Sequence, residues 1–156
     1  MDTPTQSPAP AQAHPALKKT AHVVWTGDFK TGGGAISTGS GVLKDAPYGL
    51  HSRFEGGKGT NPEELVAAAH GSCFSMALAL TLAEAGLPPT RITTDTEVTL
   101  TRGDEGYEVT ASHLDVTAVV PGIEPGRFEF LANKAKANCP ISKLLRAPIT
   151  MSARLA

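Results

Sequence analysis

The feature of this sequence that most constrains its fold is a stretch of about 25 residues, 61–85, with helix signals at both ends. Its start holds residue types that cap helices or stabilise their positive end, namely Asn61, Pro62, Glu63 and Glu64. Gly86 and the prolines after it end the pattern. At about 1.5 Å per residue the predicted helix is roughly 37 Å long, so the rest of a small domain must pack around it.

Small and apolar side chains occupy most faces of this predicted helix, and we therefore expect it to run through the core. The same segment is long enough to cross a membrane. It contains His70, Ser75 and Thr81, however, and two glutamates open it. These polar residues favour a buried helix over a membrane span.

Composition and charge exclude several classes of protein. The chain has 156 residues, of which 40% are hydrophobic and 19% charged, and this suits one folded domain. Fourteen basic residues against fifteen acidic ones give a formal net charge of −1, so we expect no nucleic acid and no anionic membrane as a partner. The first residues lack the basic and apolar segments of a signal peptide, and we expect a cytoplasmic protein.

The N-terminal residues differ in composition from everything after them. Residues 1–17 are rich in Pro and Ala and offer almost nothing to bury, so they cannot offset the entropy lost on ordering. We predict a flexible tail at 1–17 and one folded domain at 18–156.

The remaining segments predict strands and short helices around the long helix. Before the long helix, three strands are expected within 20–54, the second over 36–43 and the third running through Arg53. After it, two further strands are expected at 92–100 and 107–120. Helices are then predicted at 125–137 and 139–145, followed by a final strand at 149–155. The order is βββ-α-ββ-αα-β. Hairpin spacing indicates mostly antiparallel sheets around a long central helix, so the predicted class is α+β.

The two cysteines are too few for a disulfide-stapled scaffold, so each needs its own explanation. Cys73 lies in the middle of the long helix, where a single thiol is usually inert. Cys139 precedes Pro140 at a predicted helix start, where backbone N–H groups can stabilise a thiolate. Because 66 residues separate the two, only the tertiary fold can bring them together.

An arginine and a glutamate strengthen the case for a reactive thiol. Glu63 and Cys73 differ by ten residues, or about 1,000° of helical rotation, which leaves them about 80° apart around the helix axis. They are therefore expected to border one pocket without touching. Arg53 precedes the helix, and a guanidinium held between a carboxylate and a thiolate needs these three residue types.

Two other interpretations of the thiols remain open. His70 and Cys73 have i,i+3 spacing, and Cys139 with His51 or His113 would complete a metal site, although no tight CxxC or HxxxH pair exists. Alternatively, the chain is a dimeric structural domain with inert thiols. No glycine-rich phosphate loop or dinucleotide fingerprint is present, and we expect no cofactor and no metal.

A set of motifs identifies the family that this sequence resembles. The motifs are RFEG at 53–56, GTNPEEL at 59–65, AAH at 68–70, CFSMAL at 73–78, KAK at 134–136 and CPIS at 139–142. Together they closely resemble the OsmC branch of the OsmC/Ohr family of organic hydroperoxide reductases. The resemblance runs from about residue 18 to the end, with only the Pro-rich tail outside it.

The resemblance implies a function and a set of site residues. It implies that Cys73 is the peroxidatic cysteine, that Cys139 resolves it through a disulfide, that Arg53 activates the sulfur and that Glu63, rather than the capping Glu64, orients Arg53. It implies a thiol-dependent peroxidase that reduces organic hydroperoxides with a lipoyl-type dithiol as reductant. It also implies an intertwined homodimer with two active sites between the subunits. The alternative is a metal- or small-ligand-binding module that uses Cys73, His70 and Cys139.

A softer expectation concerns the substrate. Five apolar residues lie near the proposed groups in sequence: Phe54, Phe74, Met76, Ile141 and Leu144. If they line the mouth of the site, alkyl hydroperoxides are favoured over hydrogen peroxide by up to about 0.8 kcal/mol per buried CH₂ group.

Overall fold

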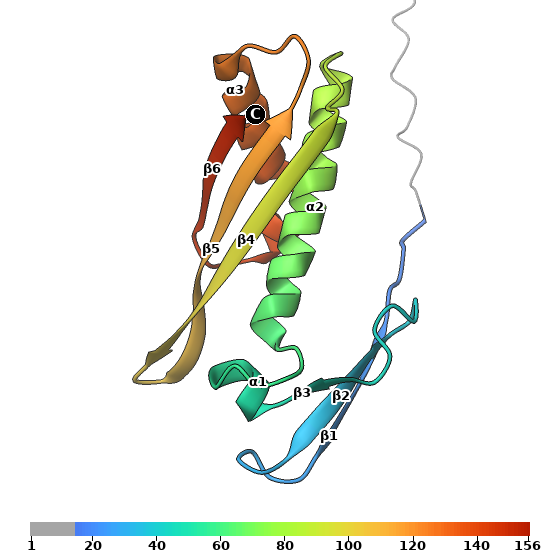
Figure 1. Ribbon diagram of the computed structural model, residues 1–156, viewed down its shortest axis with the longest axis vertical. Coiled ribbons are helices and arrows are strands. Elements are labelled where there is room, and N and C mark those ends of the chain that lie inside the picture. Colours follow the sequence, from blue (N-terminus) through green and yellow to red (C-terminus); the bar gives the residue numbers. More distant parts are fainter. Residues whose placement is uncertain (1–14) are drawn as a thin grey trace, which may run out of the picture.

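The long predicted helix is present as α2, which spans Pro62–Glu84. The backbone N–H of Glu64 donates to the Asn61 side chain over 2.8 Å, so Asn61 caps the helix as predicted. We describe a computed structural model that covers residues 15–156. Figure 1 shows α2 at the centre of the molecule, with a sheet of long strands beside it and a sheet of shorter strands beyond its N-terminal end.

The larger sheet has the strand order β4-β5-β6. Strands β4 (Arg91–Gly103) and β5 (Gly106–Val119) form an antiparallel hairpin, whereas β6 (Ile149–Leu155) pairs with β5 in parallel. Helices α3 (Pro125–Asn138) and α4 (Pro140–Leu144) connect β5 to β6. A parallel neighbour needs such a crossover, and α3 and α4 supply it.

The core of the domain lies between this sheet, α2 and α3. It is built from buried residues of those elements: Phe74, Leu78, Leu82, Leu114, Val116, Ala118, Val120, Phe128, Leu131, Ala132, Ala135 and Cys139. Gly71 permits close packing of α2 on β4, since a Cβ at this position would collide with the Thr96 hydroxyl. One face of α2 is thus fixed against the sheet and α3.

The smaller sheet precedes α2 and has the order β1-β2-β3, with both pairs antiparallel. Its strands are β1 (Ala21–Thr26), β2 (Gly33–Thr38) and β3 (Ala46–Tyr48). The second strand therefore begins and ends earlier than the predicted 36–43. Every residue of β1 is exposed, so this sheet has little core of its own within one chain.

The third predicted strand was wrong: it was expected after a turn at Pro47–Tyr48–Gly49 and through Arg53, whereas the strand lies earlier and the segment up to Arg53 is helical. Strand β3 ends at Tyr48, and residues 50–54 form a short helix, α1 (Leu50–Phe54), that the sequence pattern did not predict. Ser52 stabilises the start of α1, since its hydroxyl accepts from the backbone N–H of Gly49 over 3.0 Å. Arg53 is therefore a helical residue. With α1 added, the predicted order and the α+β class are confirmed.

The expectation that α2 runs through the core holds for one of its faces only. Met76 is 75% exposed and Leu80 61% exposed on the opposite face. By length and composition α2 would pass as a membrane span, and 33% of its most apolar window is buried. Two apolar surfaces are thus uncovered in the single chain, one on α2 and one on β1, where Val23, Val24 and Trp25 are exposed.

The tail predicted at 1–17 lies almost wholly outside the described residues. Residues 15–17 are exposed and have no regular secondary structure. The division into a tail and a domain at 18–156 therefore stays a prediction.

Candidate active site

The two cysteines, distant in sequence, meet where α2 packs against α4. Cys73 is half-buried on α2, and Cys139 is fully buried at the N-cap of α4. Both are free thiols, and each shifts the pKa of the other, so the two side chains lie close together. The tertiary fold therefore creates the thiol pair that the sequence left undetermined.

The surroundings shift the pKa values of the two thiols in opposite directions. Burial raises the pKa of Cys73, and the hydrogen bond with Cys139 raises it further, against one backbone N–H from Ile141. Burial also raises the pKa of Cys139, but backbone N–H groups of Ser142 and Ile141, the Cys73 thiol and the Ser142 hydroxyl together bring it below its ordinary value. Within one chain the thiolate thus forms more readily at Cys139.

Arg53 and Glu63 form the second half of the predicted site. The Arg53 guanidinium donates two hydrogen bonds to the Glu63 carboxylate, Nε to Oε2 over 3.0 Å and Nη2 to Oε1 over 2.6 Å. This hydrogen bonding raises the pKa of Arg53. The guanidinium also lies 5.2 Å from the centre of the Phe54 ring. Glu63 therefore holds the planar fork in a fixed orientation, while Glu64 accepts from Thr60 at the helix cap.

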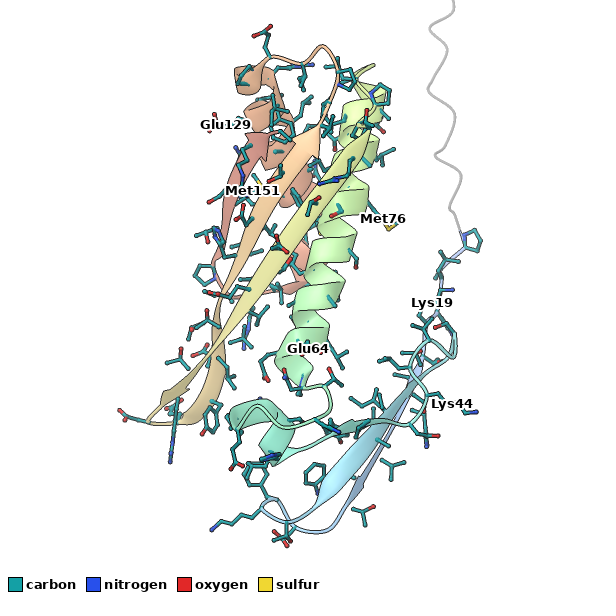
Figure 2. All side chains as sticks on the ribbon, viewed as in Figure 1. Lys19, Lys44, Glu64, Met76, Glu129 and Met151 are labelled. Carbon is teal, nitrogen blue, oxygen red and sulfur yellow. The ribbon has the colours of Figure 1, made fainter. Side chains whose placement is uncertain are left out.

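The two halves do not meet within one chain. Glu63 lies in the first turn of α2, and ten residues of helix carry Cys73 about 15 Å further along the axis. In Figure 2, Glu64 marks the N-terminal end of α2, and Met76 lies well along the helix. Among residues 15–156, the groups that shift the pKa of Cys73 include no cation. The expectation that Glu63 and Cys73 border one pocket is thus not met inside a single chain.

A small apolar pocket adjoins Arg53. Its volume is about 220 Å³, and it is lined by Trp25, Phe29, Tyr48, Gly49, Leu50, Arg53, Phe54 and Pro62. Of the five residues predicted for an apolar mouth, Phe54 alone lies here. Phe74 is in the core, whereas Met76 and Leu144 are exposed. The aromatic residues of β1 and the following turn were missed, because only the fold brings them beside α1.

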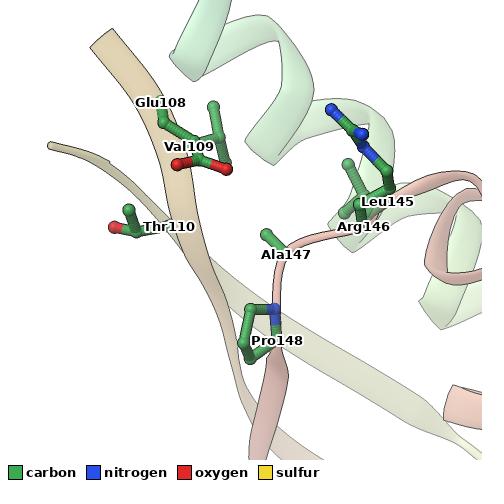
Figure 3. Close-up of a pocket in the computed structure, with 7 residues that line it drawn as sticks. All are labelled: Glu108, Val109, Thr110, Leu145, Arg146, Ala147 and Pro148. Carbon is green, nitrogen blue, oxygen red and sulfur yellow. The ribbon is translucent and has the colours of Figure 1, made fainter. Parts of the chain in front are cut away.

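A larger cavity of about 440 Å³ lies between β5 and the segment that follows α4 (Figure 3). It is lined by Glu108, Val109, Thr110, Leu145, Arg146, Ala147 and Pro148. Neither cysteine nor Arg53 reaches it, and its walls carry no nucleophilic thiol. We therefore assign the chemistry to the cysteine pair and not to this cavity.

His70 uses both of its ring nitrogens in hydrogen bonds, unlike a histidine that binds a metal. Its Nδ1 lies 2.8 Å from the Ser112 hydroxyl, and its Nε2 lies 3.0 Å from the Ser142 hydroxyl. Both ring nitrogens are thus occupied by serines. Within residues 15–156, no group of three His, Cys, Asp or Glu side chains is placed to hold a metal ion. The sequence pointed to His70, but its hydrogen-bonding role depends on residues 42 and 72 positions away.

Two free thiols in contact, drawn from separate helices, and an arginine oriented by a glutamate define a thiol-based redox protein. The family model for OsmC-like proteins matches residues 55–154. Peroxiredoxin OsmC of Escherichia coli (strain K12) is 50% identical over 139 residues, which cover 89% of this chain and 97% of that protein. The chain belongs to the OsmC family.

More distant relatives agree with this assignment. An organic hydroperoxide resistance protein of Xanthomonas axonopodis pv. citri is 29% identical over 88% of this chain and 94% of its own length. The crystal structure of the organic hydroperoxide resistance protein OhrB of Bacillus subtilis superposes with a TM-score of 0.66 at 27% identity. It covers 88% of this chain and 98% of that one. The similarity therefore spans both sheets and the helices between them.

Proposed function

We propose that this chain is a cysteine-based peroxidase that reduces organic hydroperoxides to alcohols. The observation that carries the proposal is the pair of neighbouring free thiols, Cys73 and Cys139, at the junction of α2 and α4. The names of the relatives, a peroxiredoxin and organic hydroperoxide resistance proteins, support the same reaction.

The cycle has three balanced steps. The Cys73 thiolate attacks the distal oxygen of R–O–OH, the O–O bond breaks, the alkoxide leaves and takes a proton to become R–OH, and Cys73 becomes a sulfenic acid. The Cys139 sulfur then attacks the Cys73 sulfur, and water leaves as the disulfide forms. An external dithiol reduces this disulfide through a mixed disulfide and is itself oxidised.

The first step needs a cation beside Cys73, and residues 15–156 of one chain supply none there. We therefore propose a homodimer in which the partner subunit's Arg53 and the partner subunit's Glu63 face the cysteine pair. The uncovered apolar surfaces of α2 and β1 support such an intertwined assembly, because large exposed apolar patches mark interaction sites. Two equivalent sites per dimer would follow from the symmetry.

The main contribution of Arg53 is to align the peroxide and stabilise the leaving oxygen. A free thiol of pKa about 8.5 is roughly 3% ionised at pH 7, and lowering its pKa to about 6 raises this to about 90%, a gain of roughly 30-fold. The accompanying fall in nucleophilicity removes about tenfold. Since the net gain is only a few-fold, the fixed donors of the guanidinium must act chiefly on the peroxide oxygens.

The pocket beside Arg53 favours a hydroperoxide with an apolar tail. Its walls are mostly aromatic and aliphatic, and its volume of about 220 Å³ suits a short alkyl or aryl group. A lipoyl-type dithiol is the proposed reductant, and the proposed location is the cytoplasm, where thiols are kept reduced.

Thiol titration tests the proposed function. One equivalent of cumene hydroperoxide should remove two thiols per chain, and dihydrolipoamide should restore both. Cys139→Ser should lose one thiol and yield a sulfenic acid that a cyclic 1,3-diketone labels. Retention of both thiols in the wild-type chain would refute the peroxidase, and stoichiometric zinc in the purified protein would favour the metal-binding alternative through Cys73, His70 and Cys139.

A further inference from the structure

His70 is a buried titratable residue that the proposed cycle does not use. Its side chain is 0% exposed and lies at the junction of three elements, α2, β5 and α4. Ser112 on β5 and Ser142 on α4 occupy its two ring nitrogens. A chain of three side chains thus links the core of the larger sheet to the short helix that begins at Cys139.

The direction of this hydrogen-bond chain follows from Ser112. Within residues 15–156, the Ser112 hydroxyl is fully buried and has one side-chain partner, the Nδ1 of His70. A buried hydroxyl hydrogen is costly to leave without an acceptor, so Ser112 donates to Nδ1. A neutral imidazole has one donor and one acceptor, and Nε2 therefore carries the hydrogen and donates to Ser142.

The His70 side chain is neutral at this site. Burial lowers the pKa of His70, since the imidazolium would lose its hydration inside the core. Among residues 15–156, the titratable group next to this chain of hydrogen bonds is Cys139, and Cys73 in turn lies next to Cys139. With Nε2–H filling an acceptor position of Ser142, the Ser142 hydroxyl hydrogen is free to point at Cys139.

We propose that His70 is a positioning residue for the resolving step, which holds the Ser142 hydroxyl as a hydrogen-bond donor to Cys139 Sγ. The inference rests on the proposed function. In that step the S–O bond of the Cys73 sulfenic acid breaks, an S–S bond forms and hydroxide leaves, and the proton lost by the Cys139 thiol completes the water. A donor at Cys139 Sγ stabilises the thiolate that attacks. Ser142 lies in the first turn of α4, three residues after the N-cap Cys139, which puts its hydroxyl on the same side as the backbone N–H groups that face the thiol.

Rapid-mixing kinetics of the full chain test this role. After cumene hydroperoxide oxidises Cys73, the pH midpoint of disulfide formation should rise by about one unit in Ser142→Ala. The step should be about threefold slower at pH 7, because the higher nucleophilicity of the less acidic thiol offsets part of the roughly tenfold loss of thiolate. The rate of Cys73 oxidation itself should not change. Ser142→Thr keeps the hydroxyl and should restore the rate. The matched control is Ser152→Ala, which removes an exposed serine–imidazole contact to His113 and should behave as wild type.

Two further measurements test the direction of the chain. Long-range ¹H–¹⁵N spectra of the wild-type protein should show His70 as the Nε2–H tautomer at neutral pH. Ser112→Ala, which touches neither thiol, should slow disulfide formation by a smaller factor in the same direction. An Nδ1–H tautomer, or a Ser142→Ala variant with the wild-type rate and pH midpoint, would overturn the inference while leaving the peroxidase intact. A wild-type chain that forms no disulfide would refute both.

Discussion

The two halves of this molecule are built on different principles. The larger sheet, α2, α3 and α4 share one core, and the thiol pair sits at its edge, positioned entirely by contacts within the chain. The smaller sheet with α1 carries Arg53 and an aromatic pocket but leaves β1 exposed along its whole length. Under the proposed function, the nucleophile is preformed in each chain, whereas the activating cation depends on assembly.

The largest effect expected from breaking this arrangement comes from Arg53. Arg53→Ala should lower the rate of hydroperoxide reduction by about 10²-fold or more, equivalent to roughly 2.7 kcal/mol of transition-state stabilisation. Arg53→Lys should rescue poorly, because the ammonium lacks the planar fork. The measurement is the second-order rate constant with cumene hydroperoxide. A loss below about tenfold would remove Arg53 from the central role.

A smaller loss is expected when the support of Arg53 is removed. Glu63→Gln keeps the volume but leaves one neutral acceptor, the amide oxygen, for two Arg53 donors, and the amide NH2 then faces an N–H of the guanidinium. The same rate constant should fall by about tenfold. Glu64→Gln is the matched control one position along α2, and its rate should stay near wild type. Equal effects of the two substitutions would mean that Glu63 does not orient Arg53.

The aromatic pocket in the Arg53-bearing half is expected to determine which hydroperoxide reacts faster. Phe29→Ala enlarges the pocket beside Arg53 and should lower the rate constant for cumene hydroperoxide several-fold, since each lost contact of one CH₂ costs up to about 0.8 kcal/mol. The rate constant for hydrogen peroxide should hardly change. Leu144→Ala, on an exposed side chain outside this pocket, serves as control. A parallel fall with both peroxides would place the substrate elsewhere.

The smallest expected effect is on stability in the thiol-bearing half. The pKa of His70 is lowered by burial, so below about pH 6.5 the unfolded chain binds a proton that the folded chain does not, and the free energy of unfolding falls. This one group contributes at most about 1.4 kcal/mol per pH unit. Urea unfolding between pH 5 and 8 should give a shallower pH slope for His70→Gln than for His113→Gln, a control at a half-buried histidine on β5. Identical slopes would show that His70 is charged in the fold.

The sequence predicted the thiol-bearing half well and the other half poorly. The cap at Asn61, the stop at Gly86 and the alternation of β4 and β6 are local signals, and they placed the elements that carry both cysteines. Helix α1 was missed because the segment through Arg53 was predicted as a strand that follows a turn at Pro47–Tyr48–Gly49. The hydroxyl of Ser52 stabilises the start of the helix through its contact with Gly49, and five residues are too few for a helical pattern.

The site itself divides in the same way. The pairing of Arg53 with Glu63 was anticipated, and the geometry agrees with it. The angular argument for Glu63 and Cys73 considered rotation around α2 but not the roughly 15 Å of rise between them. His70 attracted attention as a metal ligand, because its serine partners come from distant segments that no local pattern connects.

The central claim, that the thiols of one subunit meet the arginine of the other, is tested most directly by mixing two inactive variants. Equal amounts of Arg53→Ala and Cys73→Ser are unfolded and refolded together, so that half of the dimers are mixed and each mixed dimer holds one complete site. Roughly a quarter of the wild-type activity should return. If the site were complete within a single chain, the mixture would stay inactive, and that result would contradict the shared site.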